Sequence, residues 1–392
     1  MVAAQPRIYL DHNATSPLRP EARAALSEAL DTAPANASSM HAEGRAARAL
    51  LETARGQVAA LVGAAREEVV FTSGGSEAIA SAIRGVCDRA PKDRRALVLS
   101  TVEHSAVLEE ARRAEQNGFE IRRVPCDDRG RVQLRAFCEA LGPQVALACL
   151  QWANNETGVV QPVEEAGQAC RVAGVPFLVD AVQAAGKLEV DVRRVQSDLL
   201  ALSGHKIGGP QGTGALIVRR GIVLTPLIAG GAQEKRRRAG TEAVASLAGF
   251  GAAAQASNFD LSREPERLCR LRAKLETRLR LAEPEVRLHG QGVPRLPNTL
   301  NFALPDVRGE TLVIGMDLAG VALSTGSACA SGGVEPSHVI QAMGYTESEA
   351  RSSVRVSLGW STTEDDVSRF LDLFPGIVRR VREGERDRTA PA

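Results

Sequence analysis

The sequence lacks a strong charge of either sign and a long apolar run. Its 48 basic and 47 acidic side chains give a net charge of +1, so no large positive field is present to attract nucleic acid or an anionic membrane. Arg219, Arg220 and Asp317 interrupt the best apolar stretches, and none reaches the ~18 residues of a membrane span. The N-terminus has no apolar core typical of a signal peptide. We therefore expect a cytoplasmic protein with neither a membrane segment nor a nucleic-acid partner.

Cysteine motifs are also missing, and lysine is rare. The seven cysteines form no CxxC pair and no ligand spacing with histidine, which disfavours a disulfide framework and a metal site. Only five of the 48 basic residues are lysines, so a catalytic lysine has few possible positions. Lys206 follows an apolar run, whereas we expect the other four to be solvated: Lys92, Lys187, Lys235 and Lys274.

Between about residues 67 and 218, short apolar runs alternate with helical periodicity. The runs predict seven strands, at 69–72, 96–100, 121–124, 145–150, 175–180, 199–202 and 215–218. Because the runs are continuously apolar and mostly separated by helices, they predict an α/β fold with a mostly parallel sheet covered on both faces. A helix-rich stretch from 241 to about 281 leads into a smaller α+β unit, and we place the boundary near residue 260.

The first predicted strand ends in a candidate phosphate site. Ser73-Gly74-Gly75-Ser76-Glu77 follows it and opens a helix, which supplies small residues, bare amides and a hydroxyl at a positive dipole end. No Gly-Lys-Ser/Thr follows and the GxGxxG fingerprint is absent, so neither a P-loop nor a dinucleotide site is indicated. An ordinary Ser/Gly helix cap is the alternative interpretation of this turn.

Polar side chains also follow three other strands of the predicted sheet. His104 follows the second strand, Asp180 ends the fifth with Gln183 three residues on, and Ser203 and Lys206 follow the sixth. A buried carboxylate needs a cationic or hydrogen-bonding partner, and desolvation makes a lysine amine more nucleophilic. A phosphate cradle, a buried acid and such a lysine at one sheet edge together match the needs of pyridoxal phosphate.

Two further features lie in the C-terminal third. The stretch 324–333 carries almost only small side chains, so we expect a mobile loop that exposes Cys329 as a reactive thiolate rather than a core residue. Arg355 interrupts the apolar run 354–358. An arginine in a strand needs an anionic partner, and a bidentate clamp on an amino-acid carboxylate is the natural choice.

These segments in combination resemble the cysteine desulfurases, pyridoxal-phosphate enzymes of the class V aminotransferase family with fold type I. The resemblance rests on TVEHSAV, NNETG, VDAVQAAGK, SGHKIGGPQGTGAL and GSACASGGVEPSHV, and runs from LDHNATSPL to RVSLGWSTTEDDV. The long cysteine loop is similar to that of the NifS and IscS types. The resemblance implies a large cofactor domain at 14–260 and a small domain, made of 1–13 and 261–392, that carries the cysteine loop.

The resemblance also implies roles in cofactor binding. Lys206 would bond the cofactor aldehyde and shuttle a proton, Asp180 would pair with the pyridine nitrogen, and Gln183 with the phenolic oxygen. His104 would stack on the ring as a catalytic residue. The phosphate would be held by Gly75, Ser76, Ser203 and His205. Thr241 would reach the phosphate of a neighbouring subunit, which implies a homodimer.

For the reaction, the resemblance implies that Asn155 and Arg355 bind the carboxylate of L-cysteine, with Asn13 nearby in the substrate site. Cys329 would accept the sulfur as a persulfide, alanine would leave, and the sulfur would pass to an acceptor protein for iron–sulfur cluster assembly or another thiolation. Selenocysteine lyase and a simple aminotransferase remain alternatives on the same cofactor, although Cys329 argues against the aminotransferase. A catalytically inactive interaction scaffold is a third alternative, which the intact set Lys206, Asp180, His104 and Cys329 disfavours.

Overall fold

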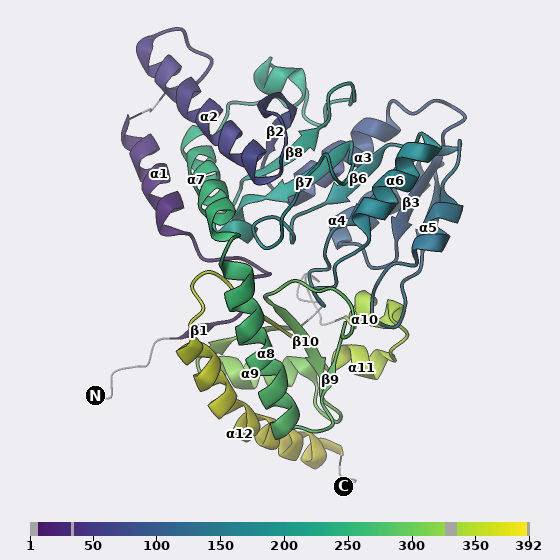
Figure 1. Cartoon of the computed structure of the whole chain (residues 1–392), viewed down its shortest axis with the longest axis vertical. Helices are drawn as coiled ribbons and strands as arrows, with labels where there is room; N and C mark the ends of the chain where they lie inside the picture. Colours follow the sequence, from purple (N-terminus) through teal and green to yellow (C-terminus); the bar gives the residue numbers. More distant parts are fainter. Residues whose placement is uncertain (1–6, 33–34, 326–334, 390–392) are drawn as a thin grey trace.

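The computed structural model describes residues 7–32, 35–325 and 335–389. Its larger unit contains a seven-stranded sheet of order β2-β8-β7-β6-β5-β3-β4, in which β8 runs antiparallel to both neighbours and the other pairs are parallel (Figure 1). The strands are β2 (Val69–Thr72), β3 (Ala96–Ser100), β4 (Glu120–Val124), β5 (Val145–Gln151), β6 (Phe177–Asp180), β7 (Leu199–Ser203) and β8 (Gly214–Val218). The predicted mostly parallel sheet is confirmed, and each strand lies within two residues of its predicted bounds.

Helices cover both faces of this sheet, so successive strand residues pack into different clusters. Val98 and Val179 join the cluster under α2, α5, α6 and α7, while Leu97 and Leu178 join the one under α3 and α4. Burial on both sides explains why the runs are continuously apolar. The helices are α1 (Pro20–Thr32), α2 (Ala42–Leu61), α3 (Gly75–Cys87), α4 (Ser105–Gln116), α5 (Leu134–Ala140), α6 (Val163–Ala173) and α7 (Val244–Asp260). Helix α1 packs on α7. The sequence analysis did not identify α1 and α2.

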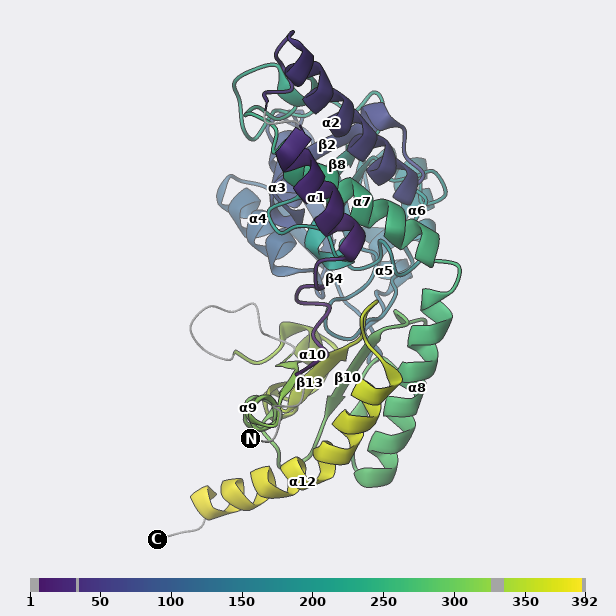
Figure 2. The ribbon, with the colours of Figure 1, turned by 90° about the vertical axis from the view of Figure 1, so that its left-hand side faces the viewer.

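The smaller unit has its own sheets and its own hydrophobic cluster. An antiparallel sheet runs β12 (Ser324–Thr325), β13 (Ser353–Ser357), β10 (Thr299–Ala303), β9 (Arg287–Leu288), and β1 (Ile8–Tyr9) pairs in parallel with β11 (Val321–Ala322). Its helices are α8 (Glu264–Ala282), α9 (Gly309–Leu318), α10 (His338–Ala342), α11 (Glu347–Arg351) and α12 (Glu364–Thr389). Figure 2 shows α8 descending from the large unit beside this sheet and α12 crossing its lower end.

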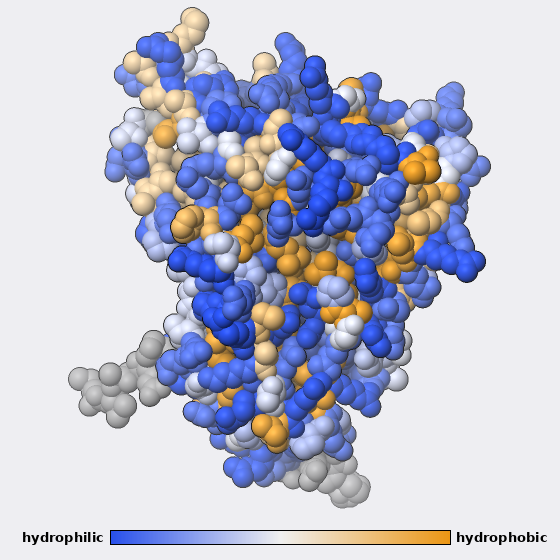
Figure 3. Space-filling model, viewed as in Figure 1, coloured by the Kyte–Doolittle hydropathy of each residue, from blue (hydrophilic) through white to orange (hydrophobic). Residues whose placement is uncertain are grey.

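The helix-rich stretch after residue 241 is two helices, α7 and α8, separated at residues 261–263. The proposed division at 14–260 and at 1–13 with 261–392 stays a prediction. On the face seen in Figure 3 hydrophilic residues dominate, and apolar ones gather towards the middle. Within the described ranges, no helix combines the length and apolar character that a membrane crossing requires.

The N-terminal segment connects the two units across their junction. His12 N donates to Ser357 O in the small unit (3.1 Å), whereas Ser16 N donates to His205 O (2.9 Å) and Arg19 N to Gly208 O (2.8 Å) in the large unit. The backbone of residues 12–16 therefore lies against the ends of β7 and β13, where the sequence analysis places its candidate residues.

Candidate active site

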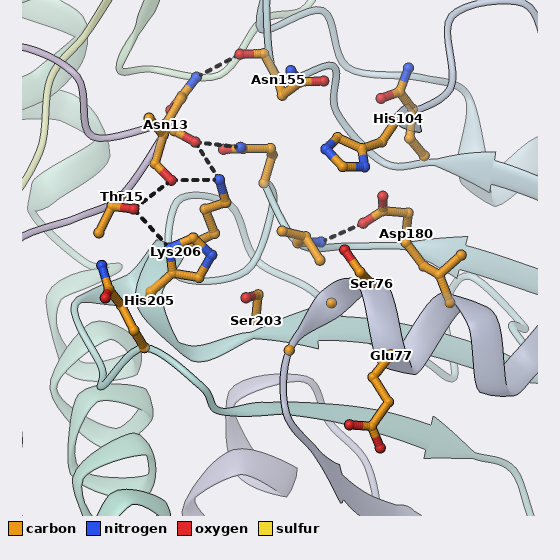
Figure 4. Close-up of a pocket in the computed structure, with 18 of the residues that line it drawn as sticks. Asn13, Thr15, Ser76, Glu77, His104, Asn155, Asp180, Ser203, His205 and Lys206 are labelled. Carbon is orange, nitrogen blue, oxygen red and sulfur yellow. Dashed lines mark hydrogen bonds between the residues drawn. The ribbon is translucent and has the colours of Figure 1, made fainter. Parts of the chain in front are cut away.

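A cavity of about 480 Å³ lies at the carboxyl ends of the strands of the large sheet, next to the N-terminal segment (Figure 4). All candidate site residues except Thr241 and Cys329 line it. These lining residues are Asn13, Gly75, Ser76, His104, Asn155, Asp180, Gln183, Ser203, His205, Lys206 and Arg355. Thr241 is exposed just before α7 and does not line the cavity. Cys329 lies outside the described residues, as does most of the loop predicted around it.

The first turn of α3 forms one end of the cavity. A Cβ at Gly75 would lie 2.8 Å from Val182 Cγ2, so a larger residue would not fit there. The carboxylate of Glu77 faces away from Ser76 (Figure 4): it accepts from Ser73 N at 2.8 Å and pairs with Arg238 Nε at 3.0 Å. The Glu77 carboxylate thus binds the Ser73 amide and Arg238 rather than the Ser76 hydroxyl. The Ser76 hydroxyl and the first turn of α3 suit an anion such as a phosphate.

Asp180, which is 8% exposed, is the last residue of β6. Within the described part of the chain, the only hydrogen bond of its carboxylate comes from Val182 N, at 3.0 Å. Burial raises the pKa of Asp180, and the charges of His104 and Lys206 oppose that rise. A cationic ring nitrogen in front of this carboxylate would favour its ionised form. This buried acid, which forms no direct ion pair with another described residue, therefore fits the pyridinium group of pyridoxal phosphate.

Lys206 lies in a short 3-10 helix, η2 (Gly204–Ile207), directly after β7. Its Nζ donates to Asn13 O at 2.6 Å and to Ala14 O at 2.8 Å. The N-terminal segment thus holds the amine at the side of the cavity (Figure 4). Gly204 is required next to it, because a Cβ there would lie 2.2 Å from Thr213 Oγ1.

His205 is hydrogen-bonded through Nδ1 to Thr15 Oγ1 at 3.1 Å. Burial, with the nearby charges of Lys206 and Lys187, lowers the pKa of His205 to about 4. His104 caps α4, since its Nδ1 accepts from Ala106 N at 3.1 Å. Burial lowers the pKa of His104 as well, against the opposing charge of Asp180. In both cases burial favours the neutral imidazole.

Lys187 contradicts its predicted solvated setting. It is 8% exposed, and its Nζ donates to Gln183 Oε1 at 2.8 Å and to Gln183 O at 3.1 Å. Burial, together with the charges of Lys206 and Arg355, lowers its pKa to about 7. The prediction was wrong because the small residues before Lys187 form a turn inside the molecule rather than a surface loop.

The opposite end of the cavity combines both units. Arg355, in β13, is 3% exposed and donates through Nη1 to Asn155 O (3.1 Å) and through Nη2 to Asp11 Oδ1 (2.8 Å). Asn13 Nδ2 donates to the same Asn155 carbonyl at 3.1 Å. These contacts bring the Arg355 guanidinium and the Asn13 amide to the backbone carbonyl of Asn155, and all three residues line the cavity. A guanidinium at this end suits an amino-acid carboxylate. The sequence analysis missed Asp11, although its place in the segment LDHN beside Asn13 was a usable signal.

A second missed residue is Glu156, next to Asn155. It is buried, and its Oε2 accepts from Ser337 Oγ at 2.5 Å. Burial raises its pKa to about 7, and both the Ser337 hydrogen bond and the charge of Arg355 limit the rise. Ser337 is also the N-cap of α10, so this carboxyl connects the Asn155 loop to the segment that follows the cysteine loop.

Comparison with known proteins agrees with this geometry. Residues 8–370 match the family described as aminotransferase class-V. A cysteine desulfurase of Cereibacter sphaeroides is 44% identical over 96% of this chain and 97% of its own length. A cysteine desulfurase IscS of Dictyoglomus turgidum is 40% identical over 96% of this chain and 95% of its own.

Solved structures give the same answer for the fold. A NifS-like protein superposes with a TM-score of 0.89 at 30% identity, covering 95% of this chain and 100% of that one. A NifS-like protein from Rickettsia africae gives 0.86 at 33% identity, with 95% and 99% covered. The chain therefore belongs to the aminotransferase class-V family and, within it, to the cysteine desulfurases.

Proposed function

We propose that this protein uses pyridoxal phosphate to remove sulfur from L-cysteine, releasing L-alanine and leaving a persulfide on Cys329. The observation that carries the proposal is that Lys206, Asp180 and the first turn of α3 line one cavity, with Arg355 at its other end. A solved structure similar to this chain, at 31% identity with a TM-score of 0.79 over 90% of it, is described as SspA in complex with cysteine. That description supports L-cysteine as the substrate here.

The cavity residues would divide the cofactor between them. Lys206 would bond its aldehyde, Asp180 its ring nitrogen and Gln183 its phenolic oxygen, while His104 would stack on the ring. The phosphate would be held by Gly75, Ser76, Ser203 and His205. When bound, pyridoxal phosphate supplies an aldehyde that condenses with amines and a ring that draws electrons from the attached amino acid.

The chain's own residues would supply orientation, proton transfer and the sulfur acceptor. Arg355 and Asn155 would fix the substrate carboxylate, and Lys206 Nζ would move the proton at the substrate Cα. The Cys329 thiolate would attack the substrate sulfur, so that a sulfur–sulfur bond forms while the carbon–sulfur bond breaks. The bonding electrons would stay with the carbon, and protonation there would give alanine. A thiol of another protein would then take the persulfide sulfur.

We also propose a homodimer in which Thr241 reaches the phosphate site of the neighbouring subunit. Exposure of Thr241 outside its own cavity is compatible with such a role. The sulfur acceptor would be an iron–sulfur scaffold or another thiolation protein, and the name IscS among the relatives favours the scaffold.

The test compares wild type with Cys329→Ala, using Cys269→Ala, which removes an exposed cysteine of α8, as the matched control. We expect Cys329→Ala to lose alanine formation by more than about a hundredfold, because the nucleophile is gone, yet to keep the borohydride-trapped cofactor adduct on Lys206. Delivery of persulfide by this variant at the wild-type rate would contradict the proposal. Formation of 3-mercaptopyruvate, the keto acid that keeps the sulfur of cysteine, with transfer of the amino group would instead indicate an aminotransferase. Uptake of no cofactor would favour an inactive scaffold.

A further inference from the structure

Lys187 is a buried amine that the proposed reaction does not use. It follows the turn at Gly186, whose φ of +73° favours glycine, and it is 8% exposed. The charges that act on it, from Lys206 of η2 and Arg355 of β13, are both positive, and its own charge acts on His12 and His205. Within the described residues no carboxylate offsets the cost of burying this amine. Burying an amine without a counter-charge lowers the stability of the folded protein, so we look for a role in orienting its neighbours.

The contacts of Lys187 determine how the Gln183 side chain is oriented. Protonated Lys187 has donors only, and it therefore selects the amide oxygen as the Gln183 atom 2.8 Å from its Nζ. On the other side, Gln183 Nε2 lies 3.0 Å from Asn13 O, which accepts only. The two neighbours therefore select the same orientation of the amide. One N–H of Gln183 bonds to Asn13, and the second is left for the cavity that Gln183 lines.

We propose that Lys187 is a positioning residue that holds the Gln183 amide with its NH₂ group available to the cavity, so that the phenolic oxygen of pyridoxal phosphate meets a donor. The proposal rests on the proposed function, because it concerns the same cofactor. Lys187 does not line the cavity itself, so its effect passes through Gln183. The positive charge of Lys187 at the Gln183 amide oxygen would also make the Gln183 NH₂ group a stronger donor. That group would therefore draw more electron density from the phenolic oxygen.

The test compares wild type, Lys187→Met, Lys187→Arg, Gln183→Leu and the double variant Lys187→Met/Gln183→Leu. The dissociation constant of pyridoxal phosphate is measured by equilibrium dialysis of the apo-protein. The pH midpoint of the visible absorption band is measured on the loaded protein. For Lys187→Met we expect about tenfold weaker cofactor binding, the effect of one hydrogen bond to a charged group. The midpoint should rise by about one pH unit, because the phenolic oxygen loses a donor.

Gln183→Leu should show the same two changes, and the double variant should show no more than either single one, since both residues act through one contact. Lys187→Arg keeps donors and charge and should stay near wild type. Wild-type affinity and midpoint in Lys187→Met, or additive effects in the double variant, would overturn the proposal.

Thermal unfolding of each apo-variant checks that it folds. Should Lys187→Met not fold, Lys187→Gln replaces it: it removes the charge and is expected to shift the midpoint upward, and a wild-type midpoint there would overturn the proposal. A wild-type protein that takes up no pyridoxal phosphate, or that carries the adduct on another lysine, would instead defeat the proposed function.

Discussion

Glu156 illustrates how strongly one residue depends on its surroundings. In an unfolded chain its carboxyl has an ordinary pKa of 4.5, but burial beside Ser337 raises the pKa to about 7. Below pH 4.5 the carboxyl is neutral in both states. As the pH rises towards 7 the unfolded chain loses the proton first, so the folded state loses stability. Above pH 7 both states are ionised and the loss is constant.

Glu156→Gln should remove this dependence, because a neutral amide can still accept from Ser337. We expect the free energy of unfolding of the variant, relative to wild type, to increase between pH 4.5 and pH 7 by up to about 3 kcal/mol. Urea denaturation of the apo-protein at several pH values measures it.

Glu103 is also buried, with its pKa raised to about 7. It is present in both wild type and Glu156→Gln, so its titration cancels in the difference between their free energies of unfolding. Glu139→Gln removes an exposed carboxylate of an i,i+4 pair and serves as the control. A constant gap between Glu156→Gln and wild type over this pH range would show that Glu156 does not titrate as inferred.

At the scale of elements, the 3-10 segment η3 (Gln233–Arg236) is held in an unfavourable backbone conformation by one buried ion pair. Glu234, Lys235 and Arg236 have φ of +45°, +56° and +64°, which costs roughly 1–3 kcal/mol at each residue. The Glu234 carboxylate meets Arg55 of α2 in two contacts, of 2.7 and 2.8 Å, and accepts from Phe71 N at 3.0 Å. These contacts fasten η3 to α2 and β2.

Glu234→Gln should lower the free energy of unfolding by up to about 3 kcal/mol, because it leaves the buried Arg55 guanidinium with only the partly exposed Glu52 carboxylate, 3.2 Å away, as a counter-charge. Chemical denaturation at pH 7 measures the change. The double variant Arg55→Met/Glu234→Met should recover a large part of the loss, since apolar side chains need no partner.

The exposed pair Arg135 and Glu139 provides the matched control: Arg135→Ala should cost no more than about 0.5 kcal/mol. An equally small effect of Glu234→Gln would mean that this ion pair does not hold η3 in place.

At the scale of the whole molecule, the cavity belongs to neither unit alone. Lys206 and Asp180 come from the large sheet, Arg355 from the small one, and Asn13 from the segment that connects them. The proposed dimer extends this sharing to a second chain through Thr241, which precedes α7 and is exposed.

Thr241→Ala should weaken binding of pyridoxal phosphate about tenfold, by loss of one hydrogen bond to a charged phosphate. Lys206→Ala should abolish activity. In a purified mixed dimer of the two variants, one site would combine Lys206 of one chain with Thr241 of the other. That dimer should regain about half of the wild-type activity at a cofactor concentration that leaves Thr241→Ala largely empty.

A mixed dimer of Lys206→Ala with wild type is the reference for half activity. If Thr241 served its own chain, the mixed dimer of the two variants would need as much cofactor as Thr241→Ala alone. A monomer in solution at working concentration would contradict the dimer directly.

Much of the large sheet could be predicted from local pattern alone. Strands buried on two faces are apolar throughout, so the strands at residues 96–100 and 145–150 can be predicted without knowing which strands lie beside them. Helices α1 and α2 were not predicted because alanines contribute to their buried faces and contrast weakly with the exposed faces. The buried residues of α1 are Ala22 and Ala29, and those of α2 include Ala47 and Ala54. Asp180 and Lys206 could be found because the first is the last residue of an apolar strand and the second lies in the turn after one.

By itself, the sequence determined where the buried strands lie and which strand ends carry an acid, a lysine and a glycine-rich helix start. Burial and helix starts depend on neighbouring residues along the chain. Only the tertiary structure decided that Lys187 is buried behind Gln183, that Asp11 pairs with Arg355, and that Asn13 holds Lys206. Those contacts join segments far apart in the chain. Local pattern cannot specify them, since they exist only once both units and the connecting segment have packed together.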